Sequence, residues 1–268
     1  GESFILGVPK LDGEVVEGSY IRIPLKTMNR HGLIAGATGT GKTKSLQIIA
    51  ESLSDASVSV VLLDVKGDLS GLAKPGVENK FIEERYALMN LDYKPEAFPV
   101  ELLTISNEPG VRLRATVLEF GSILMAKILG LNDNQAGLLS IIFKYCDDNH
   151  LPLVDLKDFI KVLQYAGDQG KADIEKEYGK IATVSLGTIL RKVIELQQQG
   201  ADTFFGEPSF DVNDLMRMDD MGRGMINIIR VTDMQDRPKL FSTFLLQMLA
   251  EVYATYPEEG DMDKPKLV

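Results

Sequence analysis

The spacing of apolar residues changes along the chain and predicts both strands and helices. Residues 58–63 form an apolar run, interrupted only by Ser59, that is β-branched at its start and too short for a stable helix. Such runs are typical of buried parallel strands. The segment that starts at Thr43 instead places apolar residues three or four positions apart, as an amphipathic helix does, at Leu46, Ile49, Ala50 and Leu53.

A second apolar run, at residues 33–35, precedes a glycine-rich loop at residues 36–41. The order strand, loop, helix, strand forms a βαβ unit, and such units imply a parallel sheet. Residues 1–30 contain the β-favouring and turn-forming residues of short strands, and residues 101–106 are typical of a further strand. The chain is therefore expected to adopt an α/β fold with a mainly parallel sheet flanked by helices.

From about residue 112 to residue 200 the apolar spacing is helical, and we expect four amphipathic helices there. Asn132-Asp133 and Asp155 are typical helix starts, and Gly200 is a typical stop. The apolar faces of the four helices are predicted from these residues: Val117, Phe120, Leu124 and Ile128; Leu138, Leu139, Ile142, Phe143 and Cys146; Leu156, Phe159, Ile160 and Leu163; Ile189, Val193 and Leu196.

The α/β pattern returns after this helical stretch. Residues 225–231 are expected to form a strand, and a helix is expected to begin near Asp236 and Pro238 and to end at Pro257. Residues 266–268 resemble the first residues of one more strand. We therefore predict four parts: an N-terminal β segment at 1–30, a first part of the core at 31–110, an all-α insert at 111–222 and a second part of the core at 223–268.

Residues 36–43, Gly-Ala-Thr-Gly-Thr-Gly-Lys-Thr, match the pattern G-x-x-x-x-G-K-[ST] without exception. By composition alone, a chance match has odds of about one in a hundred. Glycines let successive backbone N–H groups converge on one point, and the helix N-terminus adds a partial positive charge. The motif therefore predicts a loop that holds the phosphates of a nucleotide, although a glycine-rich turn without a ligand stays open.

Each part of this motif has an expected role. The backbone N–H groups hold the β-phosphate, and Lys42 reaches the β- and γ-phosphates as the catalytic cation. The Thr43 hydroxyl is the predicted Mg²⁺ ligand. The predicted nucleotide-binding residues are Gly36, Ala37, Thr38, Gly39, Thr40, Gly41, Lys42 and Thr43.

Asp64 directly follows the run at 58–63, and the carboxyl end of a parallel strand lies at the ligand edge of a sheet. Three interpretations stay open for Asp64: a Mg²⁺ ligand, a residue on the nucleotide side of the site, or a turn residue. Residues 68–71 also fit the loose D-x-x-G pattern of GTPases. The guanine-reading N-K-x-D motif is absent, however, because Asn79-Lys80 is followed by Phe81-Ile82. A GTPase or a small-molecule kinase is a third hypothesis, and the missing motif weakens the GTPase form.

Composition narrows the class of protein further. The hydrophobic fraction of 44% and the charged fraction of 25% are typical of a soluble globular protein rather than a disordered one. The single cysteine, Cys146, excludes an intramolecular disulfide framework and suggests a reducing compartment. No apolar run is long enough for a membrane helix, so we expect no membrane partner and a cytoplasmic location. The net charge of −10 argues mildly against a surface that coats nucleic acid.

The remaining candidate residues have ordinary interpretations first. His31 is expected to be structural, and His150 lacks the spacing of a metal ligand. Several arginines are each a candidate for an arginine finger that reaches a neighbouring subunit: Arg112, Arg114, Arg223, Arg230 and Arg237.

Residues 30–43 resemble the P-loop segment of the HerA/FtsK group of P-loop ATPases, and more narrowly that of the bacterial helicase HerA-like proteins. The similarity covers nearly the whole chain, through residues 63–71, 129–135, 153–158, 204–208 and 263–268. It implies a RecA-like sheet with a helical insert, ATP and Mg²⁺ as ligands, and ATP hydrolysis in a homo-oligomer, often a hexameric ring. It also implies, by analogy with better-known relatives, a motor that acts on double-stranded DNA.

In such proteins the segment that corresponds to residues 264–268 leads into the Walker B strand, with an Asp-Glu pair soon after. The Walker B aspartate and the catalytic glutamate are therefore expected beyond Val268, and residues 1–268 are expected to bind nucleotide better than they hydrolyse it. The leading hypothesis is an ATP-hydrolysing DNA translocase or helicase-like motor. The alternative is a nucleotide-dependent scaffold or switch with little turnover and no DNA partner, which the acidic composition mildly favours.

Overall fold

The computed structural model describes residues 2–208, 210–256, 260 and 262–268. The chain divides into two compact units, each built from separate stretches of sequence. The first unit holds the P-loop and comprises 1–103, 213–232 and 257–268, apart from the residues outside the described part; the second comprises 104–212 and 233–256.

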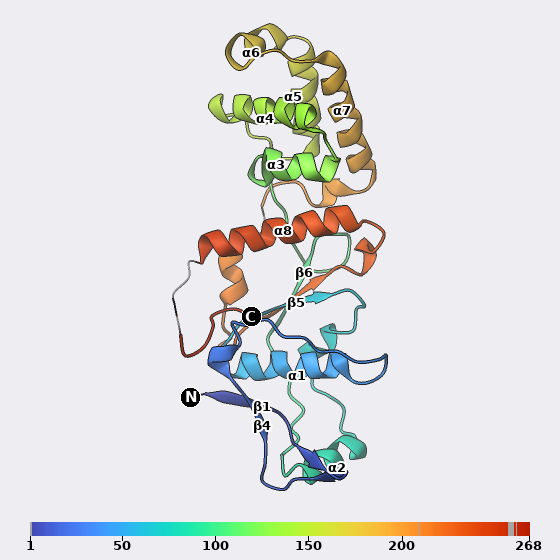
Figure 1. The fold of residues 1–268 in the computed structure, drawn as a ribbon, viewed down its shortest axis with the longest axis vertical. Helices are drawn as coiled ribbons and strands as arrows, with labels where there is room; N and C mark the ends of the chain where they lie inside the picture. Colours follow the sequence, from blue (N-terminus) through green and yellow to red (C-terminus); the bar gives the residue numbers. More distant parts are fainter. Residues whose placement is uncertain (1, 209, 257–259, 261) are drawn as a thin grey trace. The chain divides into compact units, whose positions relative to one another are not determined.

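The first unit opens with two short antiparallel pairs, as the sequence predicts for residues 1–30 (Figure 1). Strand β1 (Ser3–Gly7) pairs with β4 (Ile21–Pro24), and β2 (Lys10–Leu11) pairs with β3 (Glu14–Val15). Asp12 and Gly13 connect β2 to β3 with positive φ angles of 52° and 89°. Such angles are those of a two-residue type I′ hairpin turn, for which Asp-Gly is a preferred sequence.

The main sheet has four strands in the order β5-β8-β6-β7. They are β5 (Val60–Asp64), β8 (Ile226–Arg230), β6 (Val100–Thr104) and β7 (Val111–Arg112). Strands β5 and β8 are parallel, with Val60 opposite Ile226, and a parallel bridge from Ser59 to Leu267 places the C-terminal segment on the other side of β5. The predicted strands at 58–63, 101–106 and 225–231 and the α/β fold class are therefore confirmed, whereas residues 266–268 form only an isolated bridge to Ser59, directly before β5.

The predicted strand at residues 33–35 is wrong. Residues 31–37 have no regular secondary structure, and Leu33 is 89% exposed. A strand needs a neighbour to satisfy its backbone N–H and C=O groups, and no strand in the described part of the chain pairs with this segment. Apolar composition without a pairing partner therefore does not produce a strand here.

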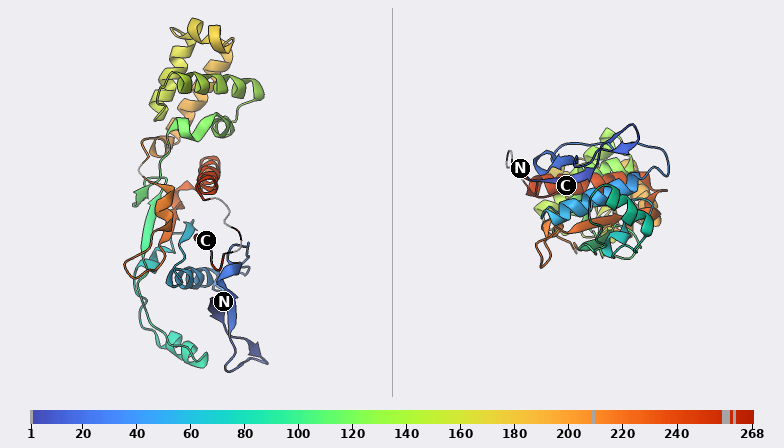
Figure 2. Two further views of the ribbon diagram at one scale, coloured as in Figure 1. Left: turned by 90° about the vertical axis from the view of Figure 1, so that its left-hand side faces the viewer. Right: turned by 90° about the horizontal axis from the view of Figure 1, so that it is seen from below.

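Helix α1 (Lys42–Asp55) follows the P-loop and packs its apolar stripe into the core of the first unit. Ala50 and Leu53 are buried there with Val60 and Leu62 of β5 and Phe4 of β1. The β1–β4 pair consequently lies beside α1, as Figures 1 and 2 show. The stripe predicted from residue 43 onward is confirmed.

The second unit is mainly helical. It contains α3 (Val117–Leu129), α4 (Asp133–Asp148), α5 (Leu156–Gly167), α6 (Lys171–Tyr178), α7 (Thr183–Gln198) and α8 (Pro238–Thr255). Asn132 and Asp155 cap α4 and α5 as the sequence predicts, and Pro238 is in the first turn of α8. Pro257, the predicted end of α8, lies outside the described residues. The remaining helical turns are 3₁₀: η1 (Leu25–Thr27), η2 (Ser70–Ala73), η3 (Ala201–Thr203), η4 (Val212–Met216) and η5 (Thr232–Met234).

Two helices are absent from the sequence prediction. Helix α2 (Lys80–Leu88) buries no residue, and α6 buries only Ile174. Neither helix therefore carries an apolar stripe that the sequence could reveal.

No helix among the described residues combines the length and the apolar character that a membrane crossing requires.

Candidate nucleotide-binding site

The P-loop owes its shape to two glycines in the left-handed region. Gly39 has φ of 81°, and Gly41, the N-cap of α1, has φ of 93°. Side chains with a Cβ are strained at these angles, so the turn into α1 requires glycine at both positions. Gly36 is required for a different reason, since a Cβ there would lie 2.5 Å from the Thr40 hydroxyl oxygen.

The carbonyl oxygen of Ala37 is the centre of the loop. It accepts hydrogen bonds from the Thr40 hydroxyl at 2.7 Å and the Thr40 backbone N–H at 3.3 Å. The Lys42 ammonium also donates to this carbonyl, at 2.7 Å, so the lysine side chain folds back across the loop. The loop is therefore already closed into a cradle, with its cation inside hydrogen-bonding reach of the backbone that encloses it.

Several backbone donors of this cradle remain available. Within the described part of the chain, the N–H groups of Gly39, Gly41, Lys42 and Thr43 have no hydrogen-bond partner. The first N–H groups of a helix cannot bond within the helix, and here they add to the positive end of the dipole of α1. Residues 36–41 are exposed, whereas Lys42 and Thr43 are half-buried. This arrangement suits a polyanion that approaches from solvent.

Asp64 ends β5 and is 1% exposed. Its Oδ1 accepts from the N–H groups of Gly67 at 2.7 Å and Asp68 at 3.2 Å, and its Oδ2 accepts from Leu69 N–H at 3.2 Å. The carboxylate therefore holds the turn at residues 65–69. Of the three interpretations of Asp64, these hydrogen bonds favour that of a turn residue. A role as Mg²⁺ ligand stays a prediction.

The profile of the family described as "Helicase HerA-like C-terminal" matches residues 10–268. The chain belongs to this family. Among curated proteins, no sequence matches the chain.

Two solved structures of the bacterial conjugative coupling protein TrwBdeltaN70 are similar to this HerA-like domain. They are an unbound monoclinic form and a trigonal form in complex with sulphate, with TM-scores of 0.46 and 0.45. In both comparisons the identity is 14%, and the similar region covers 88% of the HerA-like domain and 59% of the TrwBdeltaN70 chain. The HerA-like domain thus spans less than two thirds of the length of that protein.

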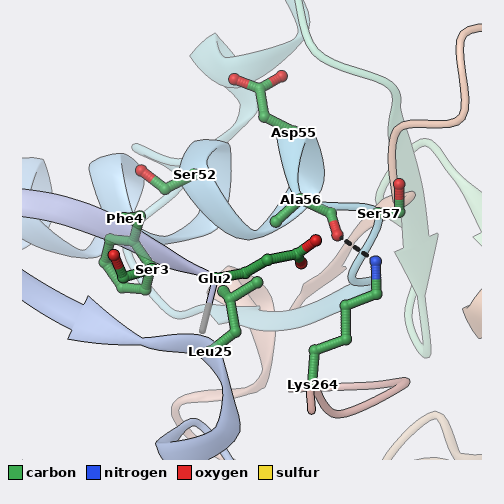
Figure 3. A pocket seen from close by; sticks show the side chains of 9 residues that line it. All are labelled: Glu2, Ser3, Phe4, Leu25, Ser52, Asp55, Ala56, Ser57 and Lys264. Atoms are coloured by element: carbon green, nitrogen blue, oxygen red, sulfur yellow. Dashed lines mark hydrogen bonds between the residues drawn. The ribbon is translucent and has the colours of Figure 1, made fainter.

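A pocket of about 530 Å³ lies at the opposite end of α1 from the P-loop (Figure 3). Glu2 and Asp55 line it together with Lys264, whose ammonium donates to the Ala56 carbonyl at 2.9 Å. Two carboxylates in one pocket repel phosphate groups, and the only nearby ammonium group drawn already caps the helix. The nucleotide-binding prediction therefore concerns the P-loop and not this pocket.

The other candidate residues belong to different elements of the two units. His31 is exposed, His150 is in the turn after α4, and no cluster of metal-ligating side chains occurs among the described residues. Arg223 bonds to the Asp219 carboxylate at 2.9 Å and to the Ala97 carbonyl at 3.0 Å. Arg112 and Arg114 belong to the second unit, as does Arg237, whereas Arg230 is opposite Asp64 in the β5–β8 register.

Sequence reasoning missed one residue next to the P-loop. Gln47, one helical turn beyond Thr43, donates from Nε2 to the carbonyl of Asp68 at 3.1 Å. Its Oε1 accepts from the Lys44 ammonium at 3.0 Å. The only sequence signal is a polar residue between apolar positions of α1, and that signal does not distinguish a solvent-exposed glutamine from one that contacts a turn.

Proposed function

We propose that this HerA-like domain binds ATP with Mg²⁺ at residues 36–43 and belongs to a protein that hydrolyses ATP. The observation that carries the proposal is the combination of a complete G-x-x-x-x-G-K-T sequence with backbone N–H groups that have no partner in the described chain. Such groups at a helix N-terminus fit a phosphate.

The residues present suit each part of the ligand. The N–H groups of Gly39, Gly41 and Lys42 would hold the β-phosphate, and the Thr43 hydroxyl would hold Mg²⁺. When bound, Mg²⁺ neutralises charge that develops on the phosphate oxygens. Lys42 would exchange the Ala37 carbonyl for the γ-phosphate, because a charged acceptor forms the stronger hydrogen bond with an ammonium. There it would stabilise the negative charge of the transition state.

At the level of the whole protein, we propose a cytoplasmic, ring-forming motor, hexameric by resemblance, that moves along or separates double-stranded DNA. Family membership supports this assignment. The DNA partner is assigned by analogy within the family and not from a DNA-binding surface. An arginine from a neighbouring subunit would complete the site in such a ring.

A second candidate function is a nucleotide-dependent scaffold or switch with little turnover and no DNA partner. The net charge of −10 favours it, because phosphate backbones bind to basic surfaces. The rate of ATP hydrolysis with and without double-stranded DNA distinguishes the two candidates. Double-stranded DNA should raise the rate of a motor and leave that of a scaffold unchanged. Assays with ATP and GTP in parallel test the nucleotide preference.

ATP hydrolysis should depend on the Lys42 ammonium group. Lys42→Ala in the full-length protein should lower the rate of ATP hydrolysis by about 100-fold or more, because the mutation removes the cation that stabilises the transition state. A phosphate-release assay measures this rate. The matched control is Lys80→Ala, since Lys80 lies on α2 with its side chain 88% exposed and should leave the rate unchanged. Turnover by Lys42→Ala at the wild-type rate would contradict the mechanism.

A further inference from the structure

The turn at residues 65–69 lies beside α1, the helix that follows the P-loop. A helix that leads through a short connection into a strand and packs on it begins at the edge of the sheet where that strand ends. Strand β5 ends at Asp64, and the Gln47 side chain of α1 reaches the carbonyl of Asp68. The P-loop helix and the turn are therefore joined directly by one side chain.

The turn is fixed at both ends and exposed in the middle. At one end the buried Asp64 carboxylate accepts three of its N–H groups, and at the other Leu69 is 3% exposed in the core of the first unit. Lys66 and Asp68 between them are exposed. Such a turn keeps its internal shape while its tip can respond to a neighbour.

The turn and the Gln47 side chain that reaches it have further neighbours on two sides. The Lys44 ammonium donates to Gln47 Oε1, which leaves the amide group of Gln47 facing Asp68. On the other side, the position that a Cβ of Gly67 would occupy lies 3.5 Å from Thr232 Cγ2, just after β8. The carbonyl of Asp64 also accepts from Val231 N–H at 3.1 Å. The contacts therefore run from the first turn of α1 to the end of β8.

We propose that Gln47 is a positioning residue that couples nucleotide occupancy of the P-loop to the turn at 65–69. The inference rests on the proposed function, since it assigns a regulatory response to the same nucleotide site. A ligand that draws on the first N–H groups of α1 fixes the helix start, and Gln47 transmits this to the carbonyl of Asp68. Nucleotide binding would then stabilise the turn, together with the segment that follows β8.

Amide hydrogen exchange of the full-length protein tests this coupling, with adenylyl imidodiphosphate and Mg²⁺ as the probe. In the wild type, the analogue should slow exchange at residues 39–43 and also at residues 67–69, whose N–H groups bond to Asp64. Gln47→Glu keeps the side-chain length and the acceptor for Lys44 but removes the donor to Asp68. This variant should exchange about three- to ten-fold faster at 67–69 and lose the response there, while 39–43 still respond.

Gln47→Lys is the matched variant, because it keeps a donor that can reach the carbonyl of Asp68. It should retain the response at residues 67–69. Unchanged exchange in α4 of the second unit shows that each variant is folded. In turnover, Gln47→Glu should lower kcat by about ten-fold and keep KM within about two-fold, because positioning is lost and nucleotide binding is not.

The outcomes separate this inference from the proposed function. If the analogue protects 39–43 in the wild type and leaves 67–69 unaffected, nucleotide binding stands and the coupling is contradicted. A Gln47→Glu variant that responds as the wild type does would also overturn the role of Gln47. If 39–43 show no protection in the wild type at millimolar analogue, the proposed function fails, and the coupling fails with it.

Discussion

The last residue of the P-loop helix is a carboxylate in an unfavourable place. Asp55 lies at the C-terminal end of α1, where the helix dipole is negative. Burial raises the pKa of Asp55, and the neighbouring carboxylates of Glu96 and Asp219 raise it further, against the opposing charge of Arg223. The Lys264 ammonium caps this helix end through the Ala56 carbonyl. The ionised form of Asp55 therefore costs stability.

The sign of this effect predicts a dependence on pH. Because the folded-state pKa lies above the unfolded value, the folded state is penalised as the pH rises through that folded pKa. Asp55→Asn should therefore raise the melting temperature at pH 7. The gain should disappear near and below the ordinary aspartate pKa of about 3.9, where the carboxyl is protonated in both states.

Thermal unfolding of the two proteins at a series of pH values measures this difference. Asp92→Asn is the control, because Asp92 is an exposed residue of the same unit. A lower melting temperature for Asp55→Asn at pH 7 would contradict the account, since it would mean that the carboxylate stabilises the helix end.

Cys146 is a potentially reactive side chain that serves only in packing. It is fully buried on α4, and burial raises the pKa of its thiol to about 11. The nucleophilic thiolate form is therefore scarce at neutral pH. Its place on the predicted apolar face of α4 explains why it is there.

At the scale of elements, the turn after β5 depends on Asp64. Asp64→Ala removes the acceptor of three backbone N–H groups and should lower the free energy of unfolding by about 3 kcal/mol. Asp64→Asn retains one carbonyl acceptor and should cost about half as much. Urea denaturation without nucleotide and with Mg²⁺ chelated measures both values.

The same experiment distinguishes the interpretations of Asp64. A residue that serves only as a Mg²⁺ ligand contributes nothing to stability when the metal is chelated. If Asp64→Ala unfolds at the wild-type urea concentration under these conditions, the turn does not depend on the carboxylate, and the metal interpretation gains. Loss of stability confirms the structural role that the three hydrogen bonds indicate.

The elements that could be predicted from the sequence are those that bury a periodic apolar face. Helix α1 buries Ala50 and Leu53 of its predicted stripe, and α4 buries all five of the apolar residues assigned to its face. The caps Asn132 and Asp155 were predictable because a side-chain oxygen before an apolar stripe has one obvious partner, the N–H groups of the first turn.

The elements that could not be predicted depend on contacts between distant segments. Residues 33–35 have the composition of a strand, yet a strand also requires a neighbouring strand. A short apolar run does not reveal whether such a neighbour exists. Gln47 and Asp68 are 21 residues apart, and only the fold brings the amide to the carbonyl. The loop shape at 36–43 was predictable, because the positive φ angles of Gly39 and Gly41 are set locally and favour glycine.

At the scale of the whole molecule, the P-loop and the turn at 65–69 belong to the first unit, whereas most helices belong to the second. The chain leaves the first unit after Thr232, whose Cγ2 lies 3.5 Å from the position that a Cβ of Gly67 would occupy. A nucleotide-dependent change in the turn would therefore reach the point where the chain passes between the units. The proposed ATP site is thus connected along the chain with the second unit.

The central claim is that the backbone N–H groups at the start of α1 hold the phosphates of ATP. A crystal structure of the full-length protein with a non-hydrolysable ATP analogue and Mg²⁺ at millimolar concentration tests it most directly. The account predicts the β-phosphate within hydrogen-bonding distance of the N–H groups of Gly39, Gly41 and Lys42, with the Lys42 ammonium moved from the Ala37 carbonyl to a phosphate oxygen. An empty loop, or an analogue bound elsewhere with Lys42 still on Ala37, would contradict it.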